Sequence, residues 1–385
     1  MTTTKNNEHK KLNVPNLRFP EFQGEWEKTK FGDIATGFDY GMNAAAKNYD
    51  GVNKYIRITD IDEASSTYTD KDIVSPDGVL TDNYLVNNRD ILLARTGAST
   101  GKSYLYKKSD GKLYYAGFLI RANVTTHDPY FVFSQLHTHR YWRWVSIMSA
   151  RSGQPGINSQ EYSSFPIYTT SIEEESKIAK LLSLLDERIA TQNKIIEDLK
   201  KLKSAISENL FNAVKGDVVI LSEICEIIKG KQVNGEFLSE KGKYYVMNGG
   251  TEPSGYYSDY NVEANTISIS EGGNSCGYVQ FNTSPFWSGG HCYTIQKIAD
   301  NVDNLYLYHY LKSKEDAIMK LRIGSGLPNI QKKDLAIFKI KIPTAKQQKV
   351  ISTFLSSLER KAEIEEIIQN SMLKEKQYLL QQMFI

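Results

Sequence analysis

The segment TGASTGKS at Thr96–Ser103 comes closest to a motif of known chemistry, the phosphate-binding loop of nucleotide-binding proteins. That loop has four residues between its glycines, so that backbone amides surround a phosphate before the lysine follows. Here Gly97 and Gly101 enclose three residues, and the related stretch EGGNSCGYV at Glu271–Val279 has no lysine. We therefore predict that both stretches are tight glycine turns between strands, and that this chain binds no cofactor itself.

Three shorter patterns contain residue types used in catalysis or metal binding, and each is incomplete. Asp128–Tyr130 (DPY) matches part of the catalytic tetrapeptide of amino-methyltransferases, but no glycine-rich cofactor loop follows a strand nearby. Pro76–Asp77 and Asp110–Lys112 have the residue types of a nuclease metal site, yet the second half of the chain does not reproduce them. His137 and His139 would point apart on a helix. The sequence thus predicts neither catalytic residues nor a metal site.

Positive charge is concentrated outside the most strongly helical part of the chain. Residues 88–121 carry seven basic and two acidic side chains, and residues 310–342 carry eight basic and three acidic ones. Residues 172–215 carry eight of each sign. This distribution favours globular parts that touch phosphates and helices that touch protein, with a merely solvated basic surface as the alternative.

The composition is that of a globular protein without a membrane span. The 385 residues are 40% hydrophobic and 24% charged, with a net charge of +2 that neither demands nor excludes nucleic acid. The polar N-terminus lacks the apolar stretch of a secretory signal, so we expect a cytoplasmic protein. Cys225, Cys276 and Cys292 are then expected to be reduced thiols.

The elements that would position these residues occur twice, at a nearly constant offset of 173 residues. SGQPGI at Ser152–Ile157 returns as SGLPNI at Ser325–Ile330, and the register then continues without a gap to Phe211 and Phe384. Such a long period indicates a duplicated domain, because solenoid repeats span about 20–50 residues. We expect a partner that also has two related parts.

Each copy has the same predicted order, namely a β-rich stretch, a short helix, the SGxPxI turn, a strand and a long helix. Strand-like runs separated by Gly, Asn and Asp include Tyr55–Thr59, Asp90–Arg95, Asn265–Ser270 and Cys292–Gln296. Short helices are predicted near Tyr130–Ala150 and Asn304–Ile323. The predicted fold class is mixed α/β (α+β) with a pseudo-twofold repeat. Its parts are an N-terminal segment (1–25), a first globular domain (26–171), a central long helix (172–215), a second globular domain (216–344) and a C-terminal long helix (345–385).

The long helices carry apolar residues in a seven-residue pattern that lasts four to five heptads, which predicts a coiled coil. The alternative is two amphipathic helices that each pack on their own domain. The predicted seam consists of Ile178, Leu185, Gln192, Leu199 and Ile206 in the first helix and Ile351, Leu358, Glu365, Met372 and Leu379 in the second. The aligned polar pair Gln192 and Glu365 is expected to set the register of the seam.

Several segments together resemble the specificity (S) subunit of type I restriction–modification enzymes, over essentially the whole chain. PNLRFPEFQGEWEKTKFGDI (Pro15–Ile34) resembles the N-terminal segment common in that family, and the two glycine turns resemble its glycine turn. The two SGxPxI segments and the starts of both long helices, SIEEESKIAKLLSLLDERI and TAKQQKVISTFLSSLERKA, are similar to those that frame its conserved helices. The second copy departs from the family by having AKQQ at Ala345–Gln348, where an acidic residue is usual.

The resemblance implies two target recognition domains, each reading one half of a bipartite, asymmetric site on double-stranded DNA. It implies that the two long helices form an antiparallel coiled coil that sets the spacer. Two modification (methyltransferase) subunits would dock on these helices and supply S-adenosylmethionine chemistry. Two restriction (motor and endonuclease) subunits would supply ATP- and Mg-dependent chemistry. The chain itself would be a non-catalytic subunit.

Charge and loop position, and not the resemblance, select the candidate DNA-binding residues. They are Arg57, Arg95, Lys102, Arg121 and Arg151 in the first copy and Lys229, Lys231, Asn274, Lys332 and Lys333 in the second. Two other classes remain open at this stage. One is a non-enzymatic coiled-coil assembly protein, and the other is an autonomous DNA methyltransferase or nuclease.

Overall fold

The computed structural model describes residues 12–150, 154–324 and 328–385, and its chain divides into two compact units. Unit 1 comprises residues 1–192 and 368–385, and unit 2 comprises residues 193–367. Both boundaries fall inside long helices, so each unit contains a part of each helix. Among the described residues, no helix is long and apolar enough to cross a membrane.

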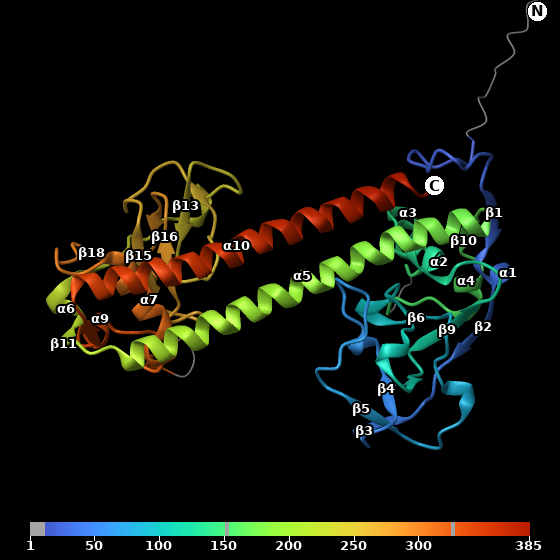
Figure 1. Cartoon of the computed structure of the whole chain (residues 1–385), viewed down its shortest axis with the longest axis horizontal. Coiled ribbons are helices and arrows are strands. Elements are labelled where there is room, and N and C mark those ends of the chain that lie inside the picture. The colour runs from blue at the N-terminus through green and yellow to red at the C-terminus, as the bar shows by residue number, and fades with distance from the viewer. Residues whose placement is uncertain (1–11, 151–153, 325–327) are drawn as a thin grey trace, which may run out of the picture. The chain divides into compact units, whose positions relative to one another are not determined.

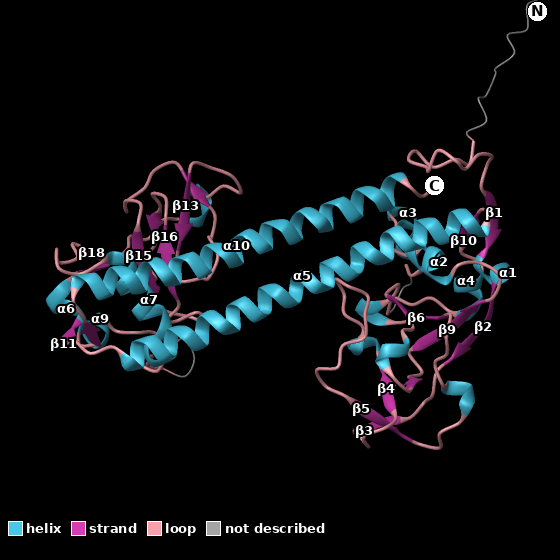
Figure 2. Ribbon diagram, viewed as in Figure 1, coloured by secondary structure: helices cyan, strands magenta, loops and turns pink. Residues whose placement is uncertain are grey.

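A four-stranded antiparallel sheet forms the centre of unit 1 (Figures 1 and 2). Its strands lie in the order β2 (Ala35–Tyr40), β9 (Leu119–Val124), β6 (Asp90–Ala94) and β7 (Ser103–Leu105). The inner strand β6 is buried along its whole length, as expected for a short, continuous apolar run. The strand predicted over Asp90–Arg95 is therefore confirmed, one residue shorter.

Unit 2 contains a sheet of the same design. Its antiparallel strands lie in the order β12 (Glu226–Lys229), β18 (Cys292–Gln296), β15 (Thr266–Ser270) and β16 (Val279–Asn282). The inner strand β15 is again wholly buried. The duplication therefore extends into the β-rich parts, although their sequences share little and their loops differ in length.

A two-stranded ribbon joins the start and the end of the globular part in each unit, and its first strand leads into a short helix. In unit 1, β1 (Glu27–Lys30) pairs with β10 (Pro166–Thr169) and precedes α1 (Phe31–Ile34). In unit 2, β11 (Asp217–Ile220) pairs with β19 (Lys339–Ile342) and precedes α6 (Leu221–Ile224). Each ribbon joins the start of a globular part to the strand that leads into a long helix.

The outer strands differ between the two units. In unit 1, β3 (Ala45–Asn48) pairs with β5 (Val74–Asp77), and β4 (Lys54–Ile56) pairs with β8 (Leu113–Tyr115). In unit 2, β13 (Tyr244–Met247) lies between β14 (Tyr256–Tyr257) and β17 (Trp287–Ser288). The strand predicted over Tyr55–Thr59 ends at Ile56, because the Asp60 carboxylate accepts from the Arg57 amide at 2.8 Å and closes a turn.

Each predicted short helix is in fact a pair of helices. Unit 1 has α2 (Pro129–Gln135) and α3 (His139–Met148), and unit 2 has α7 (Asn304–Ser313) and α8 (Glu315–Met319). The break in unit 1 occurs where the Thr138 hydroxyl caps α3 by accepting from the Tyr141 amide. Two further short helices, α4 (Ser159–Ser163) and α9 (Lys332–Ala336), follow the SGxPxI segments.

The long helices are α5 (Ile172–Ala213), with 42 residues, and α10 (Ala345–Gln382), with 38 residues. Three acidic residues, Glu173 to Glu175, occupy the first turn of α5, where the helix dipole favours negative charge. Pro343 precedes the start of α10 by two residues, and proline is common at such helix starts. Both predicted long helices are thus present.

The core of each unit contains residues from both long helices. In unit 1, Ile178 and Leu182 of α5 lie in the same hydrophobic cluster as Leu380 of α10 and Phe384 just beyond its end. In unit 2, the cluster contains Phe211 from α5 and Ile351 and Leu355 from α10. Phe211 and Phe384 are equivalent in the repeat, and each completes a core far from the start of its own helix.

Ion pairs join the two long helices within each unit. In unit 1, Lys376 of α10 lies 2.6 Å from Asp186 of α5. In unit 2, Lys203 contacts Glu359 and Lys200 contacts Glu366, each at 2.6 Å, which is an antiparallel order. The ten predicted seam residues are all buried or half-buried. Their mutual pairing along the whole seam stays a prediction.

Buried His309 of α7 is expected to make unit 2 less stable in acid. It is 2% exposed, and its Nε2 lies 2.9 Å from the Ser356 hydroxyl, with Glu359 and Lys203 nearby. Burial lowers the pKa of His309 to about 4. Its contribution to stability is therefore present above its unfolded pKa of about 6.5 and is lost as the pH falls towards 4, by about 3 kcal/mol at most. Urea unfolding should show that His309→Gln loses less unfolding free energy than wild type when the pH falls from 7.5 to 4.5. The control His139→Gln, at an exposed position, should lose as much as wild type. Equal losses in wild type and both variants would contradict the prediction.

Candidate nucleic-acid interface

The glycine turn of unit 1 lies between β6 and β7 and is held from inside the domain. Gly97 and Gly101 have φ of +68° and +94°, which favour glycine. The Tyr162 hydroxyl donates to the Ala94 carbonyl at 2.6 Å, and the Tyr141 hydroxyl donates to the Gly101 carbonyl at 2.8 Å. These two hydrogen bonds hold the backbone of the turn in place at one end of the sheet.

The described part of the SGxPxI segment of unit 1, residues 154–157, pairs with this turn. The Gly97 amide donates to the Pro155 carbonyl at 3.0 Å, and the Ile157 amide donates to the Arg95 carbonyl at 2.9 Å. Ile157 is 2% exposed, so it anchors the segment in the core. Two motifs that are about 60 residues apart in the sequence therefore form one surface.

Unit 2 repeats the same pairing. The Gly273 amide donates to the Pro328 carbonyl at 3.0 Å, and the Ile330 amide donates to the Glu271 carbonyl at 2.8 Å. Ile330 is fully buried. Each unit thus carries what we call a turn platform, which comprises residues 95–101 with 154–157 in unit 1 and residues 271–277 with 328–330 in unit 2.

Three of the predicted DNA-binding residues of unit 1 form ion pairs within the unit. Arg57 contacts Asp60 at 2.8 Å, Lys102 contacts Glu63 at 3.0 Å, and Arg121 contacts Asp39 at 3.2 Å. Such pairing reduces the positive charge that they offer to phosphates. A fourth, Arg95, lies on the turn platform, and Arg151 lies outside the described residues.

Four of the five predicted DNA-binding residues of unit 2 lie in or beside its turn platform. Asn274 is exposed in the glycine turn, and Lys332 and Lys333 are exposed where α9 begins, directly after Ile330. Lys229 lies 2.6 Å from the platform residue Glu271, and exposed Lys231 follows it by two residues. Four of the five predicted residues are therefore brought to one turn by the fold.

The incomplete catalytic patterns have structural roles in the described residues. The Asp128 carboxylate caps α2 by accepting from the amides of Tyr130 and Phe131. Asp77 lies 3.8 Å from a lysine, and Asp110 accepts from the Tyr104 hydroxyl at 2.6 Å. No group of three or more His, Cys, Asp or Glu side chains suited to a metal ion occurs in the described ranges.

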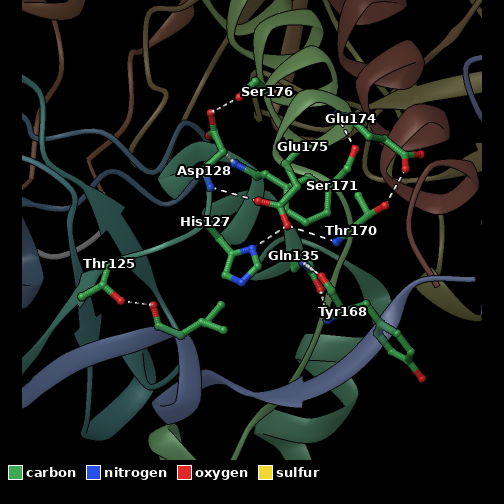
Figure 3. A network of polar contacts seen from close by, with 12 residues as sticks. Thr125, His127, Asp128, Gln135, Tyr168, Thr170, Ser171, Glu174, Glu175 and Ser176 are labelled. Carbon is green, nitrogen blue, oxygen red and sulfur yellow. Dashed lines mark hydrogen bonds and ion pairs between the residues drawn. The ribbon is translucent and has the colours of Figure 1, made fainter. Parts of the chain in front are cut away.

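A buried polar network ties the start of α5 to the rest of unit 1 (Figure 3). The Glu175 carboxylate accepts from the amides of Asp128 and Thr170 at 3.0 and 3.1 Å and lies 2.9 Å from Nδ1 of His127. Burial raises the pKa of Glu175, whose side chain is fully covered. Its neighbour Glu174 is paired with Arg18 at 2.7 Å, which attaches the N-terminal segment to the helix.

The unusual AKQQ sequence of the second copy has a structural explanation. The Gln348 amide oxygen accepts from the Asp303 amide at 2.8 Å, as Glu175 accepts from Asp128 in unit 1. Val302 is buried at the position that His127 occupies in unit 1. A His–Glu pair in one unit is therefore replaced by a Val–Gln pair in the other, and the helix start keeps its hydrogen bond.

The sequence reasoning missed this network and three residues at or beside the turn platforms, namely Tyr40, Phe118 and Glu271. The signal for the network was the acidic pair Glu174–Glu175 beside an Asp-Pro helix start, but a bond between Arg18 and Glu174 spans 156 residues and has no local pattern. These three residues are aromatic or acidic, whereas the predicted DNA-binding residues were chosen mainly for positive charge.

Comparison with a family model shows a match to the type I restriction modification DNA specificity domain at residues 23–201 and again at residues 214–374. The two matches cover most of the chain and coincide with its two copies. Both copies of the repeat therefore match the same family model.

Individual proteins that are similar to this chain are also described as type I specificity subunits. A type I specificity subunit of Mycoplasma pneumoniae is 33% identical over 145 residues, which is 37% of this chain and 38% of that protein. A specificity subunit of the MjaX type I restriction enzyme of Methanocaldococcus jannaschii is 26% identical over 399 aligned residues and 92% of each chain. The crystal structure of a type I restriction-modification S subunit from M. genitalium superposes with a TM-score of 0.69, covering 97% of this chain and 99% of that one, at 18% identity. This last match shows a shared fold.

Proposed function

We propose, because this chain belongs to the type I restriction–modification DNA specificity family, that each of its two units reads one half of a bipartite, asymmetric site on double-stranded DNA. The supporting observation is the turn platform, which both units build with the same backbone contacts and surround with different side chains. Phosphate contacts only position a protein on DNA, whereas side chains at base edges determine sequence. Two different sets of side chains on one repeated frame suit two different half-sites.

The chain's own role in this proposal is recognition and assembly. Two modification subunits dock on the long helices, supply S-adenosylmethionine and methylate adenine, and two restriction subunits supply the ATP- and Mg-dependent steps. Several apolar side chains of the helices support docking because they are exposed, among them Leu184, Leu202 and Ile367. In unit 1, Leu184 also lines a groove of about 640 Å³ together with Met372 of α10. The buried free cysteines fit a reducing compartment, so we place the protein in the cytoplasm.

Co-expression with a modification subunit, followed by genome-wide mapping of methylated adenines, tests this function. We expect one bipartite motif with two different half-sites. Methylation by the purified chain alone would support an autonomous methyltransferase instead. Absence of salt-dependent binding to duplex DNA would support a coiled-coil assembly protein.

The length of the long helices is expected to set the spacer between the half-sites. Insertion of four residues into both α5 and α10 should lengthen each helix by about 6 Å, which corresponds to roughly two base pairs. Methylation mapping of the variant should therefore report a longer spacer with both half-sites unchanged. The same insertion in α5 alone is the control, and we expect it to misalign the helices and abolish methylation. An unchanged spacer in the double insertion would refute the idea.

A further inference from the structure

Three positions at or beside each turn platform are equivalent in the two units, as the strand register shows. In unit 1, Arg95 follows β6 directly, and its amide donates to the carbonyl of Phe118, the residue before β9, at 3.1 Å. In unit 2, Glu271 follows β15 directly, and its amide donates to the carbonyl of His291, the residue before β18, at 2.9 Å. Arg95 is thus equivalent to Glu271, and Phe118 is equivalent to His291.

The third pair of equivalent residues is Tyr40 in unit 1 and Lys229 in unit 2. Tyr40 ends β2 and pairs with the second residue of β9, and Lys229 ends β12 and pairs with the second residue of β18. The next residue in each case, Gly41 or Gly230, donates its amide to the first residue of that partner strand, at 3.1 and 2.8 Å. We call Tyr40, Arg95 and Phe118 the first triad, and Lys229, Glu271 and His291 the second triad.

The first triad offers hydrogen-bond donors between aromatic rings. The Arg95 guanidinium lies 4.6 Å from the centre of the Tyr40 ring, and among the described residues only the Gly117 carbonyl accepts from it, at 3.3 Å. Phe118 is 58% exposed and Tyr40 is 42% exposed. Exposed aromatic rings beside an arginine with unused donors are typical of a binding surface.

The second triad offers an acceptor. The side chain of Glu271 is 9% exposed, and its Oε1 accepts from Lys229 Nζ at 2.6 Å and from the Tyr293 hydroxyl at 3.0 Å. Its Oε2 is buried and has no hydrogen-bond partner among the described residues. Nδ1 of the exposed His291 lies 3.7 Å from Oε2, which is beyond hydrogen-bond distance. An unpaired buried carboxylate oxygen is costly, so a donor from a ligand would relieve it.

We infer that the two triads are the specificity-determining residues of the two half-sites, and that they read bases of opposite hydrogen-bonding character. Arg95 donates to the O6 and N7 acceptors of a guanine, and Phe118 makes apolar contact beside it. Glu271 accepts from the amino group of a cytosine through Oε2, with Lys229 and His291 at its sides. These pairings follow the donor and acceptor pattern of the major groove. The inference rests on the proposed function and identifies the residues that perform it.

The test uses the complex of the full chain with its modification subunit and a panel of duplexes in which each position of the mapped motif is changed in turn. Arg95→Gln should lose preference at one position of the half-site read by unit 1. Glu271→Gln, which keeps shape and removes charge, should lose preference at one position of the other half-site. Each loss of discrimination should be about 10- to 100-fold. Arg143→Gln and Glu240→Gln make the same chemical changes at exposed positions of the same units and should leave every preference unchanged.

Thermal unfolding of each variant checks that its fold is retained. Unchanged preference at every position in both Arg95→Gln and Glu271→Gln, with the wild-type complex sequence-specific, would overturn the inference and leave the proposed function standing. A wild-type complex that prefers no sequence would overturn the proposed function, and the inference with it.

Discussion

Replacement of Phe384 with alanine is expected to lower the free energy of unfolding of unit 1 by about 3–5 kcal/mol. Phe384 is 6% exposed, and its ring centre lies 5.3 Å from that of Phe131 and 6.1 Å from that of Trp26. Removal of the ring leaves a cavity beside two aromatic side chains, Trp26 and Phe131, that are fixed by their own neighbours. The end of α10 would also lose one of its attachments to this unit.

Urea unfolding followed by tryptophan fluorescence measures this effect, since three of the four tryptophans lie in unit 1. Phe354→Ala is the matched control, because Phe354 lies on the same helix but is 44% exposed, and its cost should be about 0.5 kcal/mol or less. Phe211→Ala should destabilise unit 2 by an amount similar to that of Phe384→Ala in unit 1. Equal costs for Phe354→Ala and Phe384→Ala would show that the end of α10 is not part of the core.

Replacement of Glu175 with alanine should cost a comparable amount, about 3–5 kcal/mol. The substitution leaves the part-buried amides of Asp128 and Thr170 and the ring of His127 without their acceptor. Glu175→Gln should cost much less, because Gln348 already performs the equivalent task in unit 2. Equal costs for the two variants would contradict the assignment.

The cost of Glu175→Gln should depend on pH in a defined direction. Because burial raises the folded-state pKa of Glu175 above 4.5, its contribution to stability is fully present below that pH and is lost as the pH rises through the folded value. The glutamine has no such dependence. The difference in unfolding free energy between wild type and Glu175→Gln should therefore be larger at pH 4 than at pH 8. Measurement at both pH values decides this, and a difference that grows from pH 4 to pH 8 would show that the sign is wrong.

The sequence predicted the repeated frame well because that frame depends on local patterns. Apolar runs placed β6 and β15, and seven-residue periodicity placed α5 and α10 close to their observed ends. The glycine turns and SGxPxI segments were also found as motifs, although nothing local indicated that they pair with each other. Such pairing is decided by tertiary contacts that link distant residues.

The candidate interface was less predictable for a related reason. Arg57, Lys102 and Arg121 were chosen for their charge, but each has a carboxylate neighbour within its own unit. Asp60 lies three residues from Arg57, so this ion pair could have been predicted from the local sequence. Asp39 lies 82 residues from Arg121, and no local pattern indicates that pair. The acidic residue Glu271 could be recognised only after the strand register aligned it with Arg95.

The exchange of helix ends between the units has a consequence for synthesis on the ribosome. Unit 2 is a continuous stretch, residues 193–367, and all of its core residues have been made once that stretch has emerged. Unit 1 begins earlier but needs Leu380, Met383 and Phe384 to fill its core. The part of the chain that is translated first is therefore the part that finishes folding last, and in the meantime its unfilled aromatic pocket is open to chaperones and proteases.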